Sequence, residues 1–125
     1  MIDQSLIKLL RANFALDWQG IHGAPHWARV RQNGLMLSEM TGANPRVVEA
    51  FAFVHDSCRI DDGLDPHHGV RSADFARELV AGGHLPLNPT ELEQLVTACR
   101  LHSDGRAADT DITICTCWDA DRLDL

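Results

Sequence analysis

The sequence predicts an all-α fold, a compact single-domain bundle of about six helices that spans residues 1–125. Apolar residues recur at three- and four-residue spacing, whereas β-branched runs with an alternating pattern are scarce. A chain of 125 residues suits one domain, and an apolar content of 45% is ordinary for a globular protein.

The first three helices follow from this spacing and from the prolines near their starts. The first helix is expected over about 3–16. After the stretch GIHGAP, Pro25 suits the first turn of a second helix that ends near Gly42. Pro45 opens a third helix in the same way, and this helix is expected to end near residues 58–59.

Turn and capping signals define the remaining three helices. The loop IDDGLDP precedes a fourth helix over about 67–81, which a Gly-Gly pair closes. The segment NPTELE starts a fifth, with Thr90 as the N-cap and Glu93 completing a capping box. This helix is expected to fade by Gly105. A sixth helix covers about 111–124, although its start, DITICTC, is β-prone.

Composition argues against several classes of protein. A net charge of −7 argues against binding to a nucleic-acid polymer, because such proteins usually carry a basic stripe. No apolar run approaches the roughly 20 residues that a membrane span needs. The first residues, MIDQSLIKLL, lack the basic region and cleavage site of a signal peptide, so a cytoplasmic location is expected.

The cysteines show no spacing typical of a disulfide framework and are interpreted as reduced thiols. Two of them, Cys115 and Cys117, form a C-x-C pair, which is a weak indication of a metal site. Two small core residues are the simpler interpretation of this pair.

Helical spacing places one histidine and one aspartate of the third helix in or near the core. His55 continues an apolar stripe that includes Phe51 and Val54, so it should point inward. Asp56 lies about 100° further round the helix, near its C-terminal end. A buried carboxylate beside the negative end of a helix dipole is unfavourable unless a cation compensates it.

The same spacing selects inward polar residues in four other helices. In the fourth helix His67 shares a charged face, whereas the next histidine shares the apolar one. In the sixth, Asp119 points outward, and the aspartate two residues later aligns with Ile114 and Trp118. The second and fifth helices each align one histidine with apolar residues. The inward residues selected in this way are His26, His68, His102 and Asp121.

These inward groups together imply a compensating cation. One buried histidine has a simpler explanation, a hydrogen bond to a carbonyl group. Unpaired buried carboxylates, however, cost several kcal/mol each, and here two of them accompany several imidazoles. Imidazole with carboxylate suits a divalent metal ion such as iron, manganese, cobalt, magnesium or zinc.

Five short motifs occur in one order over roughly residues 20–124: HWARV at 26–30, HD at 55–56, HHG at 67–69, RLH at 100–102 and ADRLD at 120–124. In this order they resemble the HD-domain superfamily of metal-dependent phosphohydrolases, which implies an HD-domain-like helical fold. The dipeptide HD alone carries no information. Its place after an apolar helix, between H-x-x-R-V and A-D-R-L, makes the resemblance specific.

The resemblance also implies roles for individual residues. In that family a first histidine, the HD pair and a distal aspartate hold the metal, which here are His26, His55, Asp56 and Asp121. His68 and His102 match positions that bind a second metal in some members and contact substrate phosphate in others. Asp56, His68 and His102 are therefore the expected catalytic residues, and one ion and two ions remain alternatives.

The sequence also departs from the family pattern. Several family hydrolases have an acidic residue three positions after the HD aspartate, where this chain has Arg59. Asp61, Asp62 and Asp65 are alternatives for activating water, and a solvated acidic loop is an equal interpretation. Related proteins often continue beyond the distal aspartate, so the resemblance leads us to expect that part of the site wall is missing or comes from another subunit.

Three further residues have two interpretations each. Arg29 and Arg59 could pair with phosphate, because a guanidinium group matches its geometry. A surface position, or one behind a metal ligand, is the simpler interpretation for Arg29. Asp124 either orients a metal ligand or is an exposed C-terminal carboxylate.

The expected function is hydrolysis of a small phosphorylated compound, such as a nucleotide, by metal-activated water. The alternative is a catalytically inactive HD-like module that binds metal or regulates, which Arg59 and the short C-terminus favour. A third hypothesis is zinc held by Cys115, Cys117 and a histidine. The substrate and the oligomeric state depend on loops and surfaces that the sequence does not specify.

Overall fold

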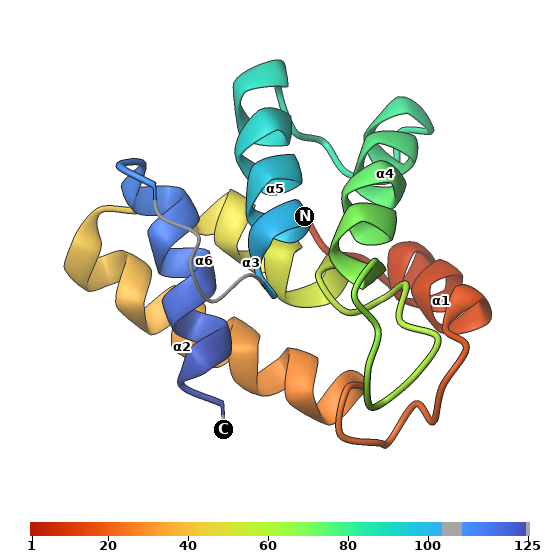
Figure 1. Ribbon diagram of the computed structural model, residues 1–125. Helices are drawn as coiled ribbons and strands as arrows, with labels where there is room; N and C mark the ends of the chain where they lie inside the picture. Colours follow the sequence, from red (N-terminus) through yellow and green to blue (C-terminus); the bar gives the residue numbers. More distant parts are fainter. Residues whose placement is uncertain (104–108, 125) are drawn as a thin grey trace.

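Six helices make up the regular structure of the part of the chain that the computed structural model describes, residues 1–103 and 109–124 (Figure 1). Those residues contain no strand, so the all-α prediction is confirmed. None of the helices described is long and apolar enough to cross a membrane. In chain order they are α1 (Gln4–Asn13), α2 (Ala24–Thr41), α3 (Pro45–Val54), α4 (His68–Ala81), α5 (Pro89–Leu101) and α6 (Ile112–Arg122).

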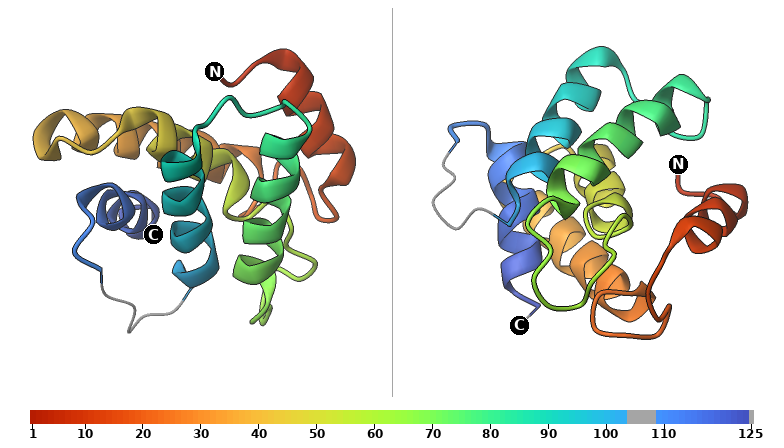
Figure 2. Two further views of the ribbon diagram at one scale, coloured as in Figure 1. Left: turned by 90° about the horizontal axis from the view of Figure 1, so that it is seen from above. Right: turned by 45° about the vertical axis from the view of Figure 1, so that its right-hand side comes forward.

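Helix α3 lies at the centre of the bundle because it is apolar on almost every side. It contacts α2, α4, α5 and α6, and α4 and α5 pack side by side over it (Figure 2). Val47, Phe51 and Val54 are fully buried, as the predicted stripe requires. His55 continues this stripe and is also fully buried. The imidazole ring of His55 therefore lies in the core, directly after the end of α3.

Two helix boundaries near the N-terminus can be compared with the prediction. Helix α2 has Pro25 in its first turn and ends at Thr41, and it is followed by the predicted Gly42, whose φ of 79° suits the residue after a helix. Helix α1 ends at Asn13, before the predicted position 16. The reason is an aromatic contact. Phe14 leaves the helix in an extended conformation, and its ring packs edge-on against that of Trp27, with the ring centroids 5.2 Å apart.

The prediction that the third helix runs to residues 58–59 was wrong. Regular α-helix ends at Val54, and the chain continues in tight turns. The N–H of Ser57 donates to the Val54 carbonyl at 3.0 Å, and the N–H of Arg59 donates to that of Asp56 at 3.2 Å. The Ser57 hydroxyl also donates to the Val54 carbonyl at 2.7 Å, which competes with helical bonding. Asp56 therefore lies at the end of α3, where helical geometry no longer fixes its direction.

The predicted cap of the fifth helix was also wrong. Asn88, not Thr90, is the N-cap, and Glu91, not Glu93, completes the capping box. Pro89 occupies the first helical position, where its missing N–H costs nothing, so the cap is the residue before it. The other two predicted starts are close, since α4 begins at His68 and α6 at Ile112. The expected fading of the fifth helix by Gly105 lies outside the described residues.

Candidate metal centre

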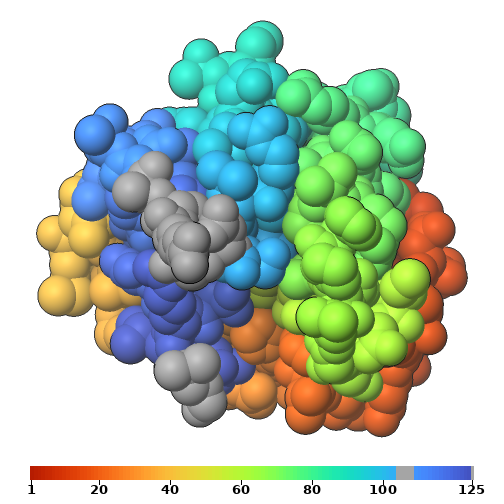
Figure 3. All heavy atoms as spheres, in the orientation of Figure 1, coloured from red at the N-terminus to blue at the C-terminus, as the bar shows by residue number. Residues whose placement is uncertain are grey.

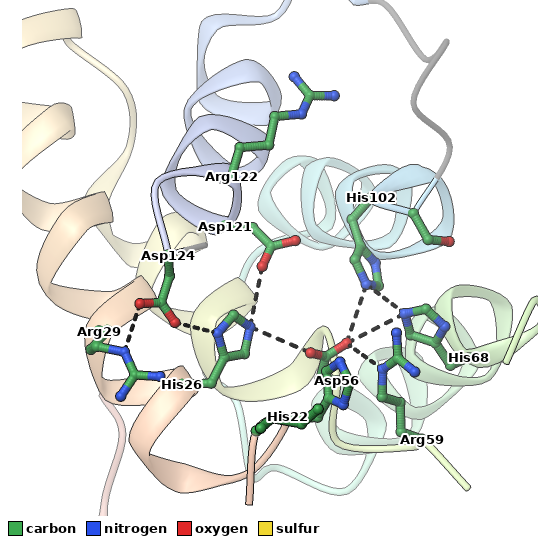
Figure 4. A pocket seen from close by; sticks show the side chains of 12 residues that line it. His22, His26, Arg29, Asp56, Arg59, His68, His102, Asp121, Arg122 and Asp124 are labelled. Atoms are coloured by element: carbon green, nitrogen blue, oxygen red, sulfur yellow. Dashed lines mark hydrogen bonds and ion pairs between the residues drawn. The ribbon is translucent and has the colours of Figure 1, made fainter. Parts of the chain in front are cut away.

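The predicted inward residues meet at one end of the bundle, where several helices begin or end (Figure 4). His26 lies in the first turn of α2, His68 begins α4, and His102 follows α5. Asp121 is in the last turn of α6, and it is half-buried as predicted, whereas Asp119 is exposed. These four residues and Asp56 line a pocket of about 580 Å³.

One group of ligand atoms surrounds a point between α2, α3 and α6. The Nε2 atom of His26 lies 3.0 Å from Nε2 of His55, 3.4 Å from Asp56 Oδ2 and 3.2 Å from Asp121 Oδ1. Nε2 of His55 lies 3.4 Å from each of the same two carboxylate oxygens. Ligand atoms bound to one metal at about 2.1 Å lie about 3.0 Å apart in octahedral and about 3.4 Å apart in tetrahedral geometry. These five spacings fit both arrangements. The set whose ligand atoms all lie within 4.8 Å of one another is His26, His55 and Asp56, without Asp121.

A second group uses the other oxygen of the same aspartate. Asp56 Oδ1 lies 3.3 Å from Nε2 of His68 and 3.4 Å from Nε2 of His102, and these two nitrogens are 2.8 Å apart. The members of this group, like His26, His55 and Asp56 in the first, approach one another closely enough to hold one ion. Asp56 therefore bridges two candidate metal sites, and its two oxygens face opposite groups (Figure 4).

The other ring nitrogen of each histidine is held by a hydrogen-bond acceptor. Nδ1 of His55, His68 and His102 donates to backbone carbonyl groups of Phe51, Asp65 and Cys99 at 3.0, 2.5 and 2.6 Å. A carbonyl oxygen has no proton to give, so each Nδ1 must carry the hydrogen. In a neutral ring the Nε2 atom then presents a lone pair to the centre of the site.

This tautomer makes the two short nitrogen–nitrogen contacts diagnostic. His26 and His55 face each other through Nε2 atoms 3.0 Å apart, and His68 and His102 do so at 2.8 Å. Lone pairs that face each other at these distances repel unless a proton or a metal ion lies between them. The geometry therefore requires positive charge at both places.

Electrostatics supports the same conclusion. Burial disfavours the charged form of His26, but hydrogen bonds to Asp121, Asp56 and Asp124 outweigh it and raise its pKa to about 10. Burial alone would raise the pKa of Asp56, yet the neighbouring charge of His55 and bonds from other histidines hold it well below its usual range. The carboxylates stay ionised, and either protons on the histidines or a bound cation can balance their charge.

Asp124 orients one of the proposed ligands, which favours the first of its two predicted interpretations. Its Oδ2 accepts a hydrogen bond from His26 Nδ1 at 2.6 Å, and its Oδ1 accepts one from Arg29 Nε at 2.6 Å. Arg29 thus lies behind a ligand, as the simpler interpretation had it. A carboxylate on the outer nitrogen of a ligating histidine is a common way to fix the ring and raise its basicity.

The three aspartates of the loop after α3, which are the alternatives for activating water, have different hydrogen-bond partners. Asp65 is committed to the loop, since it accepts hydrogen bonds from the Ile60 N–H at 2.8 Å and from Arg71 Nη2 at 2.6 Å. Asp61 accepts from the Gly63 N–H at 2.7 Å. Asp62 pairs with Nδ1 of His22 at 2.9 Å, and His22 lines the pocket.

The sequence pattern did not predict the contacts that arginine and serine side chains make at the pocket. Arg59 donates from Nε to Asp56 Oδ1 at 3.3 Å, so a cation already touches the bridging carboxylate. Arg122 and Ser103 also line the pocket, and neither was predicted. Arg122 follows an inward aspartate on the same helix, a position for which apolar spacing predicts exposure.

The cysteines do not join the candidate sites. Cys117 is buried in the core, and the thiol of Cys115 donates to the Asp109 carbonyl at 3.1 Å. Among residues 1–103 and 109–124, the two tightest groups of possible ligands, His26–His55–Asp56 and Asp56–His68–His102, contain no cysteine. Each cysteine is a free thiol, as the sequence predicted.

Comparisons of the chain with protein-family models, with curated proteins and with solved structures gave no match.

Proposed function

We propose that this protein is a metal-dependent phosphohydrolase of the HD-domain type that acts on a small phosphorylated compound. The observation that carries the proposal is Asp56, a buried carboxylate shared by two groups of histidines whose Nε2 atoms converge within 2.8–3.0 Å in each pair. The motif resemblance supports it, because every residue that it selects for metal binding borders this one place.

The ligand set fits a divalent ion of the iron, manganese, cobalt, magnesium or zinc group. His26, His55, Asp56 and Asp121 would hold the first ion. When bound, such an ion supplies Lewis acidity and a more acidic water molecule. His68 and His102 either hold a second ion with Asp56 or donate hydrogen bonds to the substrate's phosphate, and Asp124 keeps the His26 ring in position.

The charge of the pocket suits an anionic substrate despite the overall charge of −7. Its lining contains three aspartates and three arginines, whose charges balance one another. A divalent ion therefore makes the lining net positive and reverses the field that the whole chain would produce. Arg59 and Arg122 are close enough to the pocket to pair with phosphate oxygens.

A catalytically inactive module that binds metal or regulates is the second candidate. It is favoured by one observation, the Arg59 guanidinium at 3.3 Å from Asp56, in the position where several family hydrolases have an acidic residue. Such a module would bind the ion and the anion without turning the substrate over.

Metal-loaded protein assayed with p-nitrophenyl phosphate and a panel of nucleotides separates the two candidates. The hydrolase releases phosphate in proportion to bound metal, and chelation stops the release. Bound metal without turnover, for each of the five metals and across the whole panel, would refute the hydrolase and favour the module.

A further inference from the structure

A second hollow adjoins the metal pocket on the side of α4 and α5. Its volume is about 560 Å³, and three of its lining residues, Arg59, His68 and Ser103, also line the metal pocket. The two hollows therefore adjoin each other at His68, a member of the second group of ligands. We call the second hollow the side groove, and its remaining walls include Leu64, Pro66, Val70, Arg100 and Leu101.

The side groove is lined by apolar side chains that the core does not need. Leu64 is 88% exposed and Val70 is 46% exposed, although both border a concave surface. Figure 3 shows the loop that carries Leu64 on the same face of the molecule as the end of α5. Exposed apolar residues gathered around a hollow beside a reactive centre are typical of a ligand site.

The wall that carries Leu64 is held in place from several directions. Asp65, its neighbour, is buried and binds the Ile60 N–H and the Arg71 guanidinium at 2.6–2.8 Å. Arg71 Nε also donates to the Cys58 carbonyl at 3.0 Å. Arg59 Nη1 donates to the Asp61 carbonyl at 2.9 Å. The groove is thus formed before any ligand arrives, which lowers the entropic cost of binding.

We propose that the side groove binds the leaving-group part of the substrate and that this part carries a planar aromatic ring. Leu64 and Val70 offer apolar contact to one face of such a ring. Arg100 also lines the groove, and an arginine side chain stacks well on aromatic surfaces. The proposal rests on the proposed function for its orientation, since the phosphoryl group would occupy the pocket over Asp56.

Binding of two phosphonates that cannot be hydrolysed tests the groove without any need for turnover. Naphthylmethylphosphonate and methylphosphonate share the anionic group and differ in the ring, and calorimetry on the metal-loaded protein gives both affinities. The variant is Leu64→Ser, which removes apolar surface without disturbing the core. The matched control is Ile60→Ser, because Ile60 is 65% exposed in the same loop but does not line the groove.

We expect the unmodified protein to bind the naphthyl compound about tenfold more tightly than methylphosphonate. Leu64→Ser should lower this preference about fivefold. The effect is smaller than that of a contact in an enclosed pocket because the groove is open to solvent. Ile60→Ser should leave the preference unchanged. Equal affinities, no binding of either compound, or equal losses in the two variants would overturn the proposal. Preference for the ring without hydrolysis of any phosphoester would instead refute only the proposed function.

Discussion

Two buried carboxylates in this protein, Asp56 and Glu91, have opposite surroundings. Both are almost excluded from solvent, with 4% and 7% of their surfaces exposed. Glu91 accepts hydrogen bonds from the Asn88 N–H at 3.0 Å, from Asn44 Nδ2 at 2.8 Å and from Arg46 Nε at 3.0 Å. Its surroundings consist of donors, so the protein itself satisfies it.

Asp56 instead faces histidine nitrogens, which can donate to it only when their rings are protonated. Four histidine Nε2 atoms lie 3.3–3.4 Å from its two oxygens, and three of these rings carry their hydrogen on the opposite nitrogen, toward a backbone carbonyl. Arg59 supplies one donor, at 3.3 Å. Burial of a carboxylate is therefore not the sign of a metal site. The sign is a set of neighbours that can bind a cation but cannot all donate.

The largest expected effect comes from replacing the bridging carboxylate. Asp56→Asn keeps the shape of the side chain but removes the charge shared by both groups. Metal affinity should fall by more than about 100-fold, beyond the roughly 10–100-fold that loss of an outer partner costs. Calorimetric titration with zinc measures it, and turnover should fall to background.

The control for this change is the same chemical substitution at the other carboxylate. Glu91→Gln should leave metal affinity and turnover unchanged at a temperature where the protein is folded. Equal loss of metal in both variants would contradict the conclusion that Asp56, and not Glu91, supports metal binding.

The next effect in size concerns the carboxylate behind His26. Asp124→Asn removes the charge that accepts from Nδ1 at 2.6 Å and should weaken metal binding about 10–100-fold. The exposed Asp119 on the same helix offers a matched control, and Asp119→Asn should have no effect. Identical affinities for Asp124→Asn and the unmodified protein would show that the contact does not support the ligand.

Substitution of Glu91 should change the stability of the fold rather than the activity. Glu91→Gln weakens the capping box and the bond to Arg46, so the free energy of unfolding should fall by about 1–3 kcal/mol. The Asn88 N–H holds the pKa of Glu91 below its usual range in the folded state, against the effect of burial. A carboxylate whose pKa is lowered by folding stabilises the fold at pH values above its pKa in the unfolded chain. This stabilisation is lost as the pH falls through its pKa in the folded protein.

The stability difference between Glu91→Gln and the unmodified protein should therefore be full near pH 7 and shrink as the pH falls below about 4.5. Urea titrations at several pH values measure it. A difference that grows toward acid would contradict the assigned role of this carboxylate.

The smallest expected effect tests the cysteine hypothesis. Cys115→Ser alters a half-buried thiol whose hydrogen bond goes to a backbone carbonyl, and it should change metal content by no measurable amount. Elemental analysis of the variant checks this. Loss of metal in Cys115→Ser, with metal retained in Asp56→Asn, would move the site to the cysteines.

Apolar periodicity predicted the number of helices and the direction of the key side chains. It separated His68 from the exposed His67, and Asp121 from the exposed Asp119, because neighbours on a helix point about 100° apart. It could not predict the tight turns after Val54, where side-chain hydrogen bonds replace helical ones. The two-sided role of Asp56 depends on this turn, so the bridge between two groups is visible only in three dimensions.

Long-range polar contacts were equally out of reach. Arg29 and Asp124 are 95 positions apart in sequence, and nothing in local spacing pairs them. The capping box at Asn88 was missed for a local reason, because the competing pair Thr90 and Glu93 has the same signature. Pro89 decides between the two pairs.

Anomalous diffraction from crystals of the zinc- or cobalt-loaded protein tests most directly whether a cation resolves the facing lone pairs. We predict an anomalous peak bounded by Nε2 of His26, Nε2 of His55 and Oδ2 of Asp56, and the peak should disappear in Asp56→Asn crystals. Loaded crystals with no peak at that point, or with peaks only beside the cysteines, would contradict the account.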